Sequence, residues 1–193
     1  MKSTIRKRTY RAIYRLLNRV SPLADDCGRL CGALCCQPPG ESDNPEEDFQ
    51  LGIYLLPGEE KIFTKKENWL LWSYDWAEDY DFPPSWHGKV WFVRCTTPPH
   101  CRREKRPLQC RFYPLQPDLD EQDRLQMILS TEKTPYTCPL IRSKLPLQPA
   151  FLHASYTVWR HLLRDPLIHD LVAMDSARRR EKNITRTVIF PPR

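Results

Sequence analysis

Eight cysteines are the residues of this 193-residue chain whose type and spacing most strongly indicate chemistry. Four of them fall within ten consecutive residues and four follow singly: Cys27, Cys31, Cys35, Cys36, Cys95, Cys101, Cys110 and Cys138. Thiolates are the ligands that soft metal ions and iron–sulfur clusters prefer. The pattern therefore predicts a metal centre held by a subset of these eight thiols.

The spacing of the cysteines bears on which metal is bound. In a helix, Cys27, Cys31 and Cys35 would share one face, although two intervening glycines weaken that helix. Structural zinc is typically held by two closely spaced cysteine pairs, and no clean second pair follows the first. Single cysteines around one dense run are more typical of an iron–sulfur cluster. We therefore expect an iron–sulfur cluster, with zinc as the alternative.

Two other uses of the cysteines compete with metal binding. An even count permits disulfides, but Arg11, Arg15 and Arg19 interrupt the apolar residues that an export signal needs. No apolar stretch is long enough to span a membrane, so a cytoplasmic location is expected, where thiols stay reduced. The cysteines could also be unligated core residues, but a core gives no reason to cluster thiols.

Positive charge is concentrated at the start of the chain. Seven basic residues precede the first acid, Asp25: Lys2, Arg6, Lys7, Arg8, Arg11, Arg15 and Arg19. Ile5, Ile13 and Leu17 recur among them near helical spacing, which predicts a basic amphipathic helix over residues 1–20. Its polar face is either a solvated surface or a contact for an anionic partner, RNA or lipid.

The remaining elements must position the later cysteines. Residues 51–56 and 89–95 read as strands, the second ending at Cys95, and residues 125–130 as a weaker strand. Short helices are expected within 59–72, and two longer helices over 150–182 divide at Asp165-Pro166. We predict an α+β fold: a small irregular sheet with a cysteine-rich metal-binding core, flanked by N-terminal and C-terminal helices.

The expected organisation has four parts. The basic helix 1–20 precedes a cysteine-cluster domain over 21–145. Helices over 146–182 pack on that domain, and a tail over 183–193 is short enough to fray.

Residues 106–114 read Arg-Pro-Leu-Gln-Cys-Arg-Phe-Tyr-Pro. With the run Cys31-x3-Cys35-Cys36, this segment resembles the YkgJ-type cysteine-cluster family of bacterial proteins, regarded as zinc- or iron-chelating domains. The resemblance covers about residues 27–140. Because the early run is spaced differently from the family's, it leaves open which early cysteines are ligands. A similar Cys-Arg-x-Tyr-Pro element occurs in flagellin lysine methylases, which hold an iron–sulfur cluster, and this favours a cluster here.

The predicted function is therefore metal binding through cysteine thiolates, with the role of the centre open. One alternative is a zinc-stabilised module that binds RNA or membrane through residues 1–20. Another is a cluster-dependent protein-modifying transferase, although no glycine-rich G-x-G-x-x-G loop is present. Arg106 and Arg111 flank Cys110, where guanidinium groups would offset thiolate charge; alternatively, Arg111 pairs with a surface carboxylate.

Overall fold

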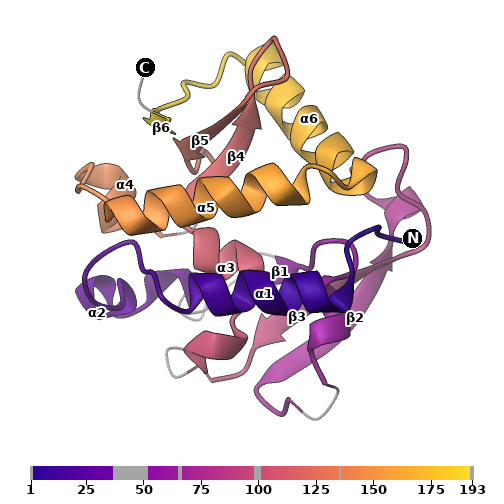
Figure 1. Cartoon of the computed structure of the whole chain (residues 1–193), viewed down its shortest axis with the longest axis horizontal. Helices are drawn as coiled ribbons and strands as arrows, with labels where there is room; N and C mark the ends of the chain where they lie inside the picture. The colour runs from indigo at the N-terminus through magenta and orange to yellow at the C-terminus, as the bar shows by residue number, and fades with distance from the viewer. Residues whose placement is uncertain (1, 37–51, 65–66, 98–100, 135, 192–193) are drawn as a thin grey trace, which may run out of the picture.

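The computed structural model describes residues 2–36, 52–64, 67–97, 101–134 and 136–191, and Figure 1 shows their arrangement. Helices combine with two small antiparallel sheets of three strands each. This architecture confirms the α+β class that the sequence predicts. No described helix combines the length and apolar character that crossing a bilayer requires.

The first sheet delivers Cys95 to its position. Its strands, in the order β1–β3–β2, are β1 (Ile53–Tyr54), β2 (Leu70–Trp76) and β3 (Lys89–Cys95). Strand β3 ends at Cys95, as expected, and pairs there with Leu70. Strand β2 replaces part of the helical region expected over 59–72. Among the described residues of that range, the 3-10 turn η3 (Glu59–Ile62) is the helical part. Trp72 packs across the sheet against Trp91, 5.9 Å between ring centroids, which favours the extended form.

The second sheet includes the C-terminal segment. It comprises β4 (Leu115–Leu119), β5 (Leu125–Leu129) and β6 (Val188–Phe190), in that order. Strand β5 lies where the sequence predicts a strand. Strand β6 was not expected, since the tail was predicted to fray, yet Phe190 pairs with Met127. The rings of His153 and Tyr156 lie 4.7 and 5.2 Å from Phe190 and hold the segment in place.

The helices differ widely in length. The described α-helices are α1 (Lys7–Leu17), α2 (Gly28–Cys31), α3 (Leu108–Phe112), α4 (Pro139–Arg142), α5 (Pro149–Leu162) and α6 (Pro166–Glu181). Further 3-10 turns are η1 (Leu34–Cys36), η4 (Ala77–Asp79) and η5 (Arg103–Lys105). Proline starts α4, α5 and α6, where its missing N–H costs no helical bond. Asp165 caps α6 and also accepts a 2.6 Å hydrogen bond from the Thr4 amide, which ties the N-terminal segment to α6.

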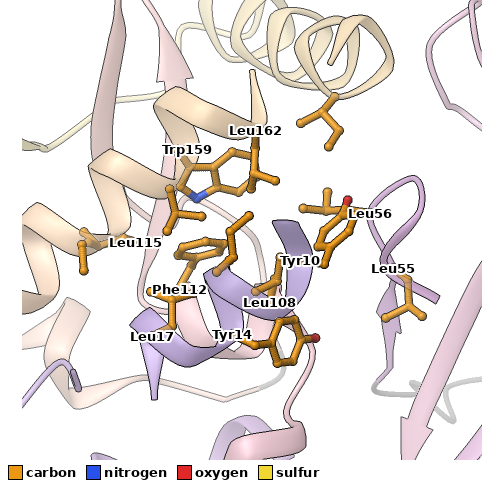
Figure 2. Close-up of a cluster of buried hydrophobic side chains, with 14 of the residues drawn as sticks. Tyr10, Tyr14, Leu17, Leu55, Leu56, Leu108, Phe112, Leu115, Trp159 and Leu162 are labelled. Carbon is orange, nitrogen blue, oxygen red and sulfur yellow. The ribbon is translucent and has the colours of Figure 1, made fainter. Parts of the chain in front are cut away.

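The main core lies where α1, α3 and α5 meet. Figure 2 shows Tyr10 and Leu17 of α1 gathered with Phe112 of α3 and Trp159 of α5. The rings of Phe112 and Trp159 lie 5.1 Å apart. Figure 1 shows α1 beside α5, with α2 and α4 at the same end of the molecule. The core therefore brings two cysteine-bearing segments, far apart in sequence, to one end.

Candidate metal centre

A small cavity between α2 and the start of α4 is lined by four of the eight cysteines: Cys27, Cys31, Cys35 and Cys138. Other residues complete its wall: Gly28, Leu30, Leu34, Tyr113, Tyr136, Pro139 and Leu140. Its volume is about 20 Å³, the space of roughly one water molecule or one ion. Thiols from two distant segments thus face one confined space.

The early cysteines reach this cavity from a helix shorter than the sequence suggests. The Gly28 amide donates to the Asp26 side chain at 3.1 Å, which fixes the start of α2. The helix ends after one turn because Gly32 adopts a left-handed conformation with φ of 64°. Cys27 and Cys31 are four residues apart across this turn, and so lie on one side of it. Cys35 arrives separately, from η1.

Cys138 comes to the cavity from the second chain segment, at the start of α4. It immediately precedes α4, and its carbonyl accepts a 2.9 Å hydrogen bond from the Arg142 amide. The hydroxyl of Tyr113 lies within hydrogen-bonding reach of Tyr136 and Cys138. The segment 106–114 therefore contributes Tyr113 to the cavity, although its cysteine is Cys110.

The four cysteines line one cavity, but their side chains are not arranged around a common point as metal ligands would be. Among the described residues, no group of three or more His, Cys, Asp or Glu side chains is arranged to hold a metal ion. Burial, and then the charges of Asp26 and Cys31, raise the pKa of Cys27 to about 11, so this thiol is protonated at neutral pH. As a neutral thiol, Cys27 gains no electrostatic energy from approaching the other sulfur atoms. A bound ion would displace the protons and draw the sulfurs together.

Cys95 and Cys101 form a second group. Their thiols are within hydrogen-bonding reach of each other, and Arg106 Nε lies 3.0 Å from Cys101 Sγ. The same guanidinium pairs with Asp26 at 3.0 Å. Burial alone would raise the pKa of Asp26, but hydrogen bonds from Arg106 and Gly28 lower it overall. Arg106 therefore stands beside a thiol, as expected, but that thiol is Cys101.

The structure describes the side chain of one of the two remaining cysteines. Cys110 lies on α3 within electrostatic reach of Tyr14 and is not part of the cavity wall. The side chain of Cys36 lies outside the described part of the structure. Of the eight predicted ligands, four thus surround one cavity and two form a neighbouring pair.

Arg111 has a structural role that the sequence did not suggest. Its Nε and one terminal nitrogen donate to the carbonyls of Arg106 and Arg103 at 2.7 and 2.9 Å, and the other terminal nitrogen donates to Asn18. Its guanidinium also lies over the ring of Tyr14, 4.3 Å from the centroid. Arg111 therefore fastens the segment that carries Arg106 to α1, and does not pair with a surface carboxylate.

Replacing Arg111 by lysine should lower the free energy of unfolding by about 2–4 kcal/mol, because a single ammonium cannot reproduce several charged hydrogen bonds. Urea unfolding followed by tryptophan fluorescence measures the change. Arg102→Lys is the matched control, since Arg102 forms an exposed ion pair with Glu104 and its replacement should change stability little. Equal effects of the two substitutions would show that Arg111 does not fasten this segment.

Sequence reasoning missed three side chains at the cavity and its border: Asp26, Tyr113 and Tyr136. Asp26 directly precedes Cys27, and Tyr113 lies in the segment that carries the family resemblance. Their positions in the sequence could therefore have identified both as candidates for the site. Comparison of the chain with family models, with curated proteins and with solved structures found no match. The resemblance to the YkgJ-type family therefore stays a prediction.

Proposed function

We propose that the protein binds one soft metal ion through Cys27, Cys31, Cys35 and Cys138. The observation that supports this is that four cysteines, from segments over a hundred residues apart, line one cavity. Their donor chemistry suits zinc, which is commonly bound by four cysteines. The bound ion would cross-link the segment around α2 to the start of α4.

The small volume of the cavity supports a single ion over a cluster. About 20 Å³ is room for one ion, whereas an iron–sulfur cluster brings several iron and sulfide atoms into the site. We therefore favour zinc over the cluster expected from the sequence. The transferase alternative and the cytoplasmic location rest on sequence alone and stay predictions.

Anaerobic purification followed by zinc, iron and sulfide analysis tests the proposal. We expect about one zinc per chain and no acid-labile sulfide. Iron with matching sulfide, together with visible absorption, would show that the centre is a cluster. A protein that neither retains metal nor takes up added zinc would show that these thiols are not ligands.

A further inference from the structure

Helix α1 and the residues around it present an unbalanced positive charge. Seven basic side chains, all exposed, contribute this charge: Lys2, Arg6, Lys7, Arg8, Arg11, Arg15 and Arg19. Within the described ranges, none of the seven forms an ion pair, whereas Arg178 and Arg179 of α6 both pair with acids. Within the described residues, these charges therefore do not stabilise the fold through salt bridges.

The apolar side of α1 is already committed to the core. Tyr10 and Leu17 are 0% and 3% exposed, and Figure 2 shows both within the buried cluster. The hydroxyl of Tyr10 donates to the Pro57 carbonyl at 2.7 Å, and that of Tyr14 donates to Glu59 at 2.6 Å. A membrane-bound amphipathic helix must bury its apolar face in lipid. Because α1 cannot do so without leaving the core, its partner must be recognised by charge.

The exposed arginines of α1 form a row. Arg8, Arg11 and Arg15 follow the spacing that aligns side chains on one helix face, over roughly 10 Å at about 1.5 Å per residue. Guanidinium groups bind phosphates through paired hydrogen bonds. Helix α5 lies beside α1 (Figure 1), while the three arginines stay exposed on an open surface.

We propose that this face binds the phosphate backbone of single-stranded RNA. A flexible single strand can adapt the positions of its phosphates to a row of charges on an open surface. No aromatic ring is exposed among the described residues of α1, because Tyr10 and Tyr14 are buried. Binding should therefore be insensitive to base sequence and strongly dependent on salt. This surface is separate from the cysteine cavity.

The test is fluorescence anisotropy with a labelled 12-nucleotide uridine RNA across a salt series. The wild-type protein should bind, and the triple variant Arg8→Gln, Arg11→Gln, Arg15→Gln should flatten the slope of log affinity against log salt by about 2. At 0.1 M salt this corresponds to roughly hundredfold weaker binding. A matched triple variant at exposed sites elsewhere, Lys133→Gln, Arg142→Gln, Lys182→Gln, should keep the wild-type slope.

Two results would overturn the proposal. Equal flattening by both triple variants would mean that binding reflects net charge and not this surface. Binding to phosphatidylserine vesicles without binding to the RNA would identify lipid as the partner. The zinc content of the first variant should equal that of the wild type, so that this test and the test of the metal centre stand independently.

Discussion

Replacing Cys138 by serine should remove most of the bound zinc and weaken zinc affinity at least about a hundredfold. Cys138 lines the cavity together with Cys27, Cys31 and Cys35 and comes from the other chain segment. Loss of a residue that merely orients a ligand typically weakens metal binding about 10- to 100-fold, so loss of a ligand should cost at least as much. Elemental analysis and competition with a chelator measure the effect.

Cys110→Ser is the matched control, because it makes the same chemical change outside the cavity wall. It should leave zinc content and affinity near the wild-type values. The sequence alone does not distinguish Cys110 from Cys138 as a ligand, whereas in the folded structure Cys138 lines the cavity and Cys110 does not. Retention of zinc by the Cys138 variant, or equal loss in both variants, would contradict the proposed ligand set.

Glu59→Ala should lower the free energy of unfolding by about 3–5 kcal/mol. Glu59 is fully buried and accepts hydrogen bonds from the Tyr14 hydroxyl at 2.6 Å and the amides of Leu108 and Leu56 at 2.8 and 3.0 Å. The substitution leaves all three donors without this partner, each at about 1–3 kcal/mol. For a chain of this size the melting temperature should fall by about 10 °C.

Glu60→Ala is the control for this position, since Glu60 is half-buried and should change stability by at most about 0.5 kcal/mol. Thermal unfolding followed by circular dichroism measures both variants. If the two variants have the same melting temperature, the hydrogen bonds of Glu59 do not stabilise the contact between α1, η3 and α3 as the structure indicates.

The same carboxyl should make stability depend on pH. Its three donors favour the ionised form, but burial outweighs them and raises the pKa of Glu59 above its ordinary value of 4.5. The folded protein then holds this proton more tightly than the unfolded chain does. The contribution of the Glu59 carboxyl to the free energy of unfolding is therefore present in full below pH about 4.5. It is lost as the pH rises through the pKa of this group in the folded protein. Glu59→Gln should remove this part of the pH dependence, and urea unfolding between pH 5 and 8 tests it.

Much of the fold could be predicted from local sequence signals. Helical spacing indicated α1, and the Asp165-Pro166 step separated α5 from α6, because proline and a capping acid act locally. Strands β2 and β6 could not be predicted in this way. Their extended form depends on distant partners: Trp91 for β2, and the rings that hold Phe190 for β6.

The sequence was enough to predict that cysteines form the candidate site, but not which of the eight cysteines do so. Clustered thiols indicated a metal ligand group, yet spacing gave no means to choose Cys138 over Cys110. That choice follows from Tyr113 and the start of α4, which bring Cys138 opposite α2. Likewise, Arg106 and Arg111 look equivalent in sequence, but one contacts a thiol and the other contacts backbone carbonyls.

The most direct test of the central claim is to map which thiols zinc protects from alkylation. The protein is treated with iodoacetamide with zinc bound and after chelation, and labelling of each cysteine is measured by mass spectrometry. We predict that bound zinc slows the labelling of Cys27, Cys31, Cys35 and Cys138, while Cys110 reacts equally in both states. Labelling of the four cavity cysteines at the same rate with and without zinc would contradict the account.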